Sequence, residues 1–259
     1  MAPRGLKRAL QTTAATRLGG SGKHKCFRRI GTDGTDGERL QGLTKALNKK
    51  IYSKGKLPEI ARRAAAPRPG GHWRGPNAGR KRGARVDAQV SRVINNGPSS
   101  AKHVHVYGLT KTCFAAMTKL GLTPILAQRA LSCNLSCRVG TAADIIAYDE
   151  ALNKLVVVEL KSGYDQGRDL PATRAGKECR LGAPLEGSKD TTRARHMAQL
   201  LATWAMLKRE KKLFERLGEL GVSAEVGAVL LYCNDEGAES VELCDWWFKR
   251  GPALLEALK

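Results

Sequence analysis

The sequence lacks several features that would place it in common protein classes. It has no apolar run of about 18 residues, the length that a helix needs to cross a bilayer. Its N-terminus is polar and basic, so we expect no apolar secretory signal. It has no glycine-rich Walker loop, which argues against ATP use. Of the seven cysteines only Cys133 and Cys137 lie close together, and the sequence offers no second Cys or His pair to complete a zinc site with them. The scattered cysteines favour reduced thiols in an intracellular protein.

Acidic residues are scarce in the first third of the chain. Residues 1–85 hold 22 Lys and Arg but only 4 Asp and Glu, a net charge of +18. Residues 86–259 hold 23 basic and 20 acidic residues, a net charge of +3. The total of +21 favours a polyanionic partner, nucleic acid first and acidic lipid second. Because Arg80, Lys81 and Arg82 form a basic cluster just ahead of the neutral part, we expect them to contact nucleic acid.

The composition divides the chain into two parts. Residues 1–79 are rich in Gly, Ala and basic residues and have little periodicity, which predicts a basic, poorly ordered N-terminal arm or linker. Residues 80–259 are predicted to form one folded domain. The first 30 residues carry eight Lys and Arg and no acid, a composition that suits a nucleic-acid arm, a nuclear import signal or a mitochondrial presequence alike.

The hydrophobic patterns after residue 80 alternate between helix and strand and predict an α/β fold. A short helix is also expected within the arm, from about residue 38 to 50. In the domain, helices are expected over residues 83–95, 110–120 and 190–211, with a short one at the C-terminus. Strands are expected over residues 104–107, 123–132, 138–148 and 154–161, and a hairpin joins 228–232 to 240–243. The valine-rich strand at 154–161 should be central in the sheet.

Three charged residues converge in the hairpin formed by the strands at 138–148 and 154–161. If the turn is centred near residue 152, Asp144 lies across from Glu159, and Lys161 shares the face of Glu159. Two carboxylates held across a hairpin can bind Mg²⁺ or Mn²⁺, and the ion can activate water against a phosphate. A neighbouring Lys can offset charge on the phosphate. The alternative is a structural ion pair at the end of the strand.

Gly140-Thr141-x-x-Asp144, followed after fourteen residues by Glu159-Leu160-Lys161, resembles the PD-(D/E)XK nuclease superfamily. The closer likeness is to its exonuclease branch, which includes phage lambda exonuclease, herpesvirus alkaline nuclease and RecB-type nuclease domains. The resemblance implies a restriction-endonuclease-like mixed sheet core flanked by helices, and Mg²⁺-dependent cleavage of DNA, with Mn²⁺ as a substitute. Ala143 stands where the motif has Pro.

Two helices extend the resemblance. Asp87 lies where the family keeps a helix that often supplies a further acidic metal ligand. Gln199 matches the glutamine of the helix that follows the core in the RecB-like branch, where it joins the catalytic set. On that same helix Arg193, Arg195 and His196 are candidates for contacts to nucleic acid, and Gln128 is a candidate to line the same cleft.

The function predicted from the sequence is therefore Mg²⁺-dependent hydrolysis of DNA, by an exonuclease of repair, recombination or genome processing. A restriction-type or junction-resolving endonuclease is one alternative. A DNA-binding protein that keeps an inactive nuclease fold is another. The expected location is the nucleus or a site of viral or mobile-DNA replication, with the mitochondrion as an alternative. An oligomer is compatible with the sequence but not predicted by it.

Overall fold

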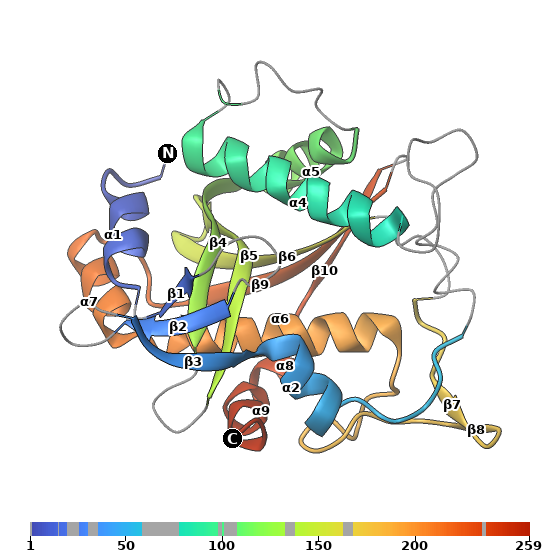
Figure 1. The fold of residues 1–259 in the computed structure, drawn as a ribbon. Helices are drawn as coiled ribbons and strands as arrows, with labels where there is room; N and C mark the ends of the chain where they lie inside the picture. The colour runs from blue at the N-terminus through green and yellow to red at the C-terminus, as the bar shows by residue number, and fades with distance from the viewer. Residues whose placement is uncertain are drawn as a thin grey trace.

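The computed structural model describes residues 2–14, 16–19, 26–30, 36–58, 78–97, 100, 108–132, 138–162, 168–234 and 237–259 (Figure 1). Within these ranges the protein has an α/β fold, in which a mixed parallel and antiparallel sheet is flanked by helices. The fold class predicted from the sequence is confirmed. No helix among these residues is long and apolar enough to cross a membrane.

The sheet contains eight of the described strands (Figure 1). Their order is β1 (Thr16–Gly19), β2 (Cys26–Ile30), β3 (Asp36–Gly42), β5 (Val139–Asp149), β6 (Lys154–Ser162), β9 (Val226–Cys233) and β10 (Ala238–Glu242), and β4 (Leu122–Ser132) pairs with β5 beside this path. The pairings of β3 with β5 and of β6 with β9 are parallel, and the neighbouring pairings are antiparallel. Strand β6 is central, as its valine run predicts.

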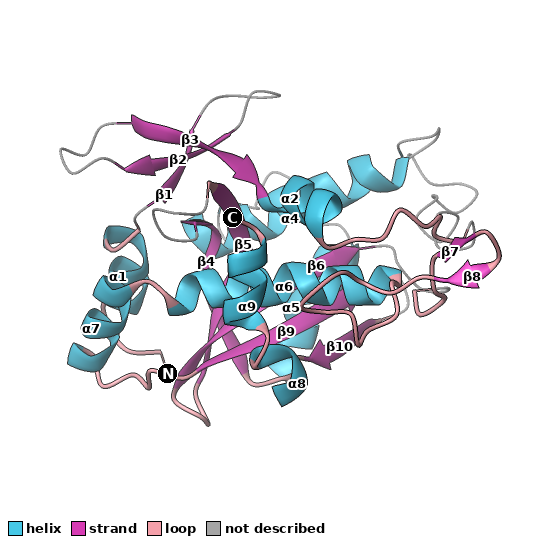
Figure 2. Ribbon diagram, turned by 90° about the horizontal axis from the view of Figure 1, so that it is seen from below, coloured by secondary structure: helices cyan, strands magenta, loops and turns pink. Residues whose placement is uncertain are grey.

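Helices cover both faces of the sheet (Figures 1 and 2). Helices α4 (Ala78–Asn96) and α5 (Gly108–Lys119) pack on one face, against the side of β6 that carries Val156 and Val158. Helices α2 (Leu43–Lys50), α6 (Thr192–Lys208) and α9 (Gly251–Ala257) cover the other face, which carries Leu155 and Val157. The predicted alternation of faces along β6 is therefore confirmed.

The remaining elements lie around this core. Helix α1 (Leu6–Thr12) packs against α7 (Lys211–Glu219) and β4, and α8 (Asp245–Phe248) precedes α9. Strands β7 (Thr173–Arg174) and β8 (Lys177–Glu178) form a small hairpin outside the main sheet.

Most predicted elements of the domain are present within a few residues of the expected bounds. Two predictions are wrong. The helix expected from 38 to 50 is half strand, because residues 36–42 extend to pair with β2 and β5, and only Leu43–Lys50 is helical. The helix expected over 190–211 ends at Lys208, and Lys211 begins the separate α7. The strand expected at 104–107 lies outside the described residues.

Parts of the expected arm are folded onto the domain. Leu6 and Leu10 of α1, Leu47 of α2 and Ile51 are almost completely buried in the same core as α6. Gln41 and Gly42 pair with Val139 and Gly140 at the start of β5. The elements are only seven or eight residues long, so their apolar spacing is too brief to stand out in the sequence. Residues before position 79 therefore contribute to the core of the domain.

Candidate active site

The predicted hairpin register between β5 and β6 is observed. The paired residues run from Asp149 opposite Lys154 to Ile145 opposite Val158, which makes Asp144 and Glu159 the next pair. The ladder ends before that pair, so the two strands separate at the carboxylates. The carboxylate of Asp144 takes the place of a backbone acceptor there, because its Oδ2 accepts a hydrogen bond from the backbone N–H of Leu160 at 3.0 Å.

Glu159 and Lys161 project from β6 toward α6. Beyond the separation from β5, β6 stays in register with β9, which pairs Glu159 with Leu230 and Lys161 with Tyr232 and so keeps β6 extended. Glu159 is 1% exposed. One of its oxygens, Oε1, forms an ion pair with the Lys161 ammonium, and no described residue hydrogen-bonds the other, Oε2. The ammonium also donates to Oε1 of Gln199 on α6 at 3.4 Å.

Gln128 links Asp87, the third acidic candidate, to Asp144. It lies between two residues of β4 that pair with Ile145 and Ala143, and therefore across from Asp144. Its backbone has a φ of 58°, an uncommon conformation for a residue with a side chain. Its Nε2 donates to Oδ1 of Asp87 at 3.0 Å and lies 3.5 Å from Oδ1 of Asp144. The structure therefore brings Asp87, on α4, to the same place.

Asn95 fixes the backbone beside Gln128. Its side-chain amide donates to the carbonyl oxygen of Ala127 at 3.1 Å, and its Oδ1 accepts from the N–H of Ala127 at 2.9 Å. This two-point contact holds the distorted segment of β4 against the end of α4, where the carbonyls of Ile94 and Asn95 also accept from Lys7 of α1. The sequence gives no separate signal for Asn95, because its role depends on the approach of α4 to β4.

Burial dominates the electrostatics of the two carboxyls. Burial raises the pKa of Asp144, opposed by Lys161 and by its hydrogen bonds from Leu160 and Gln128. Burial and then the neighbouring Asp144 raise the pKa of Glu159 to about 8, against the opposing effect of Lys161. Two adjacent acidic groups in a low dielectric cannot both ionise cheaply. Without a further cation, the pair therefore retains a proton at neutral pH.

The arrangement has the character of a cation site, although it is not a closed one. Among the described residues, no group of three or more His, Cys, Asp or Glu side chains could hold a metal ion as they stand. Ionising both Asp144 and Glu159 in this buried place is costly, because Lys161 supplies only one positive charge and Oε2 of Glu159 accepts no hydrogen bond from a described residue. Carboxylate oxygens are the donors that Mg²⁺ prefers. Asp144 and Glu159, with Asp87 close by, are therefore the residues that could hold a hard divalent cation.

The predicted nucleic-acid contacts on α6 are occupied by protein groups. Arg193 donates to Asp169 at 2.6 and 2.9 Å and to Glu239 at 2.6 Å. Arg195 donates to both oxygens of the buried Asp190, at 2.6 and 2.8 Å. These carboxylates offset the charges that would bind phosphates.

His196 is also engaged by the protein. Its Nδ1 lies 3.0 Å from the hydroxyl of Tyr232, and burial lowers its pKa well below the usual range, which favours the neutral ring. The side chains of the other predicted contacts, Arg80, Lys81 and Arg82, lie outside the described part of the chain.

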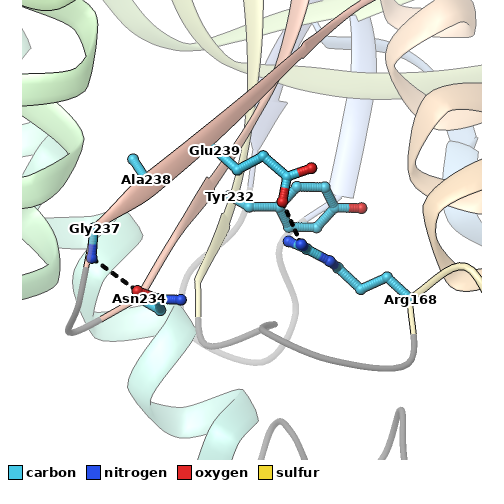
Figure 3. A pocket seen from close by; sticks show the side chains of 6 residues that line it. All are labelled: Arg168, Tyr232, Asn234, Gly237, Ala238 and Glu239. Carbon is cyan, nitrogen blue, oxygen red and sulfur yellow. Dashed lines mark hydrogen bonds and ion pairs between the residues drawn. The ribbon is translucent and has the colours of Figure 1, made fainter.

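A cavity of about 240 Å³ lies where β9 ends and β10 begins, and it is lined by Tyr232, the sheet partner of Lys161 (Figure 3). The Arg168 guanidinium stands 4.1 Å from the centre of the Tyr232 ring and forms an ion pair with Glu239. Asn234 accepts a hydrogen bond from the N–H of Gly237 at 2.9 Å (Figure 3). The sequence did not indicate this cavity, because the pairing of β6 with β9 joins residues about 70 positions apart.

Tyr52 is a further residue that the sequence did not indicate. It is buried, its hydroxyl donates to the carbonyl of Arg195 at 2.8 Å, and the Arg195 guanidinium lies 4.9 Å from its ring centre. Burial raises its pKa, with Glu159 and Asp190 adding to the effect. The segment that follows α2 therefore reaches the edge of the carboxylate site.

A scan against protein-family models finds no match for this chain, and a search of curated proteins finds no relative. A mixed sheet with helices on both faces is shared by many unrelated functions. The likeness to PD-(D/E)XK nucleases therefore depends on the motif residues alone.

Proposed function

We propose that the protein is a divalent-metal-dependent nuclease that hydrolyses phosphodiester bonds in DNA. The observation that carries the proposal is the meeting of Asp144, Glu159 and Lys161 where β5 and β6 separate, with a buried oxygen of Glu159 that no described residue hydrogen-bonds. An ordinary strand-end ion pair would explain Glu159 with Lys161. It would not explain a second buried carboxylate beside them.

Asp144 and Glu159 would hold the Mg²⁺ ion, with Asp87 as the nearest further acidic group. When bound, the ion would polarise a phosphate oxygen and lower the pKa of a bound water. Both carboxylates must be ionised to act as ligands. Because burial raises the pKa of both, we expect binding of the ion and loss of a proton to be coupled.

The surrounding residues orient the reacting groups. The Leu160 N–H and the Gln128 amide fix the Asp144 carboxylate from two sides. Gln199 accepts from the Lys161 ammonium, which holds this positive charge at the open end of the strands. An ammonium held there can offset the negative charge that develops on a phosphate during attack by water.

The preference for DNA and for exonuclease action rests on different observations. The net charge of +21 favours a polyanionic substrate. Exonuclease action is favoured only by the likeness of the motif to the exonuclease branch. An endonuclease remains the alternative, and so does a DNA-binding protein without turnover.

The test compares linear duplex DNA with covalently closed circular DNA of the same sequence, in Mg²⁺ and in Mn²⁺. We expect the linear DNA to be degraded and the circle to survive. We also expect Asp144→Asn and Lys161→Met to abolish degradation while DNA binding persists. Lys111→Met serves as the matched control, because Lys111 is an exposed residue of α5.

Each remaining outcome has a defined meaning. Cleavage of the circle would favour the endonuclease. Binding without turnover in either metal would favour the inactive fold. Full activity of Asp144→Asn would refute the proposed site.

A further inference from the structure

A strongly basic edge lies beside the candidate site. It consists of Lys49, Lys50, Lys54 and Lys56, from the end of α2 and the segment after it, and of Arg174 and Lys177 in the β7–β8 hairpin; all six are exposed. We call this group the basic edge. No Asp or Glu occurs between residues 43 and 58. Glu178 of the hairpin pairs with Lys189 at 2.7 Å, so its charge is already offset.

The two segments of the basic edge are fixed to each other through their backbones. Lys56 and Thr173 exchange two hydrogen bonds, of 2.9 and 3.1 Å, and the N–H of Gly182 donates to the carbonyl of Ile51 at 2.6 Å. Both views show the chain after α2 running beside the loop that carries β7 and β8 (Figures 1 and 2). The cations therefore project from one backbone-paired surface and not from an independent tail.

The basic edge is also joined to the carboxylate site. The N–H of Ser53 donates to Asp190 at 2.9 Å, and the hydroxyl of Tyr52 donates to the Arg195 carbonyl. Asp190 lies two residues before the start of α6 and Arg195 lies on it, and the same helix brings Gln199 to Lys161. A polyanion lying along the basic edge would therefore extend toward the end of β6.

A favourable interaction with the helix dipole explains the presence of only some of these six cations. Lys49 and Lys50 lie in the last turn of α2, where cations interact favourably with the helix dipole. The same effect cannot account for Lys56, Arg174 or Lys177, which lie outside any helix. None of the six forms an ion pair with a described carboxylate. Concentrated positive charge without counter-charges destabilises a fold by repulsion, and a polyanionic ligand relieves that repulsion.

We propose that the basic edge binds the phosphate backbone of duplex DNA next to the site of hydrolysis. The inference rests on the proposed function for its choice of DNA over other polyanions. In this proposal, folded residues on both sides of position 79 bind the DNA. Arg193 and Arg195, which were predicted to contact nucleic acid, can then form ion pairs within the protein instead.

The test measures affinity for a labelled duplex by fluorescence anisotropy in EDTA, in an Asp144→Asn background, between about 50 and 200 mM salt. The variant is Lys49→Gln, Lys56→Gln and Lys177→Gln together. Each phosphate contact contributes about 0.9 to the slope of log affinity against log salt. If all three contacts are lost, raising the salt from about 50 to 200 mM should lower the affinity of the Asp144→Asn protein about 40-fold more than that of the triple variant. The matched control changes Lys111, Lys119 and Lys212 to Gln, three exposed residues of α5 and α7.

An unchanged slope in the edge variant, or an equal loss in the control, would overturn the inference. So would binding to phosphatidylserine vesicles without binding to the duplex. Because the assay needs no turnover, it separates the two proposals. A reduced slope together with inactive wild-type protein would leave the basic edge standing and refute the nuclease, whereas cleavage with an unchanged slope would do the reverse.

Discussion

Replacing Glu159 by Gln should stabilise the metal-free protein, and the gain should depend on pH. Burial raises the pKa of Glu159 from 4.5 to about 8, so the folded state binds a proton more tightly than the unfolded state does. Stability from this group is therefore fully present below about pH 4.5 and is lost as the pH rises through about 8. Since each pKa unit corresponds to about 1.4 kcal/mol, the loss amounts to about 5 kcal/mol.

The assay is urea unfolding of both proteins in EDTA at several values between about pH 4.5 and 8.5. The unfolding free energy of the variant minus that of the wild type should grow by several kcal/mol across this range, to at most about 5 kcal/mol. The contribution of His196 cancels in the difference, whereas Asp144 contributes to it because Asp144 and Glu159 shift each other's pKa. Adding Mg²⁺ should flatten the wild-type curve and leave that of the variant nearly unchanged. Parallel curves in EDTA would show that Glu159 is not held in a desolvated site.

Three further changes probe the fold around the site. Leu47→Ala should cost about 2–5 kcal/mol in a urea titration, because Leu47 is fully buried; a loss below about 0.5 would indicate a loose arm. Asn95→Ala should cost about 1–3 kcal/mol, since it leaves the backbone of Ala127 without its two-point partner, and unchanged stability would contradict that role. Arg129→Met alone should cost about 3–5 kcal/mol by leaving Glu210 buried and unpaired; if adding Glu210→Leu recovers nothing, the buried ion pair is not the cause.

The sequence predicts the centre of this protein better than its edges. The hairpin of β5 and β6 could be predicted with its register, because a short turn joins two strands whose alternation fixes which residues face each other. That register alone places Asp144 across from Glu159. The following helix could be predicted from its apolar spacing, and in the structure it brings Gln199 to Lys161.

Contacts between distant segments could not be predicted. The parallel pairing of β6 with β9 brings Tyr232 beside Lys161 across about 70 residues, and no local pattern encodes it. Arg193 resembles a free phosphate-binding residue until the fold supplies Asp169 and Glu239 as partners. Tyr52 lies in a stretch whose composition suggests a linker, yet its burial depends on α6.

The most direct test of the carboxylate centre is the single-turnover cleavage of linear duplex DNA at saturating DNA and Mg²⁺. The comparison is between the wild-type protein and the double variant Asp144→Asn, Glu159→Gln, with duplex binding measured in parallel in EDTA. We expect Mg²⁺-dependent cleavage by the wild type, and none above background by a double variant that still binds the duplex. Equal cleavage by the two proteins, or none by the wild type, would contradict it.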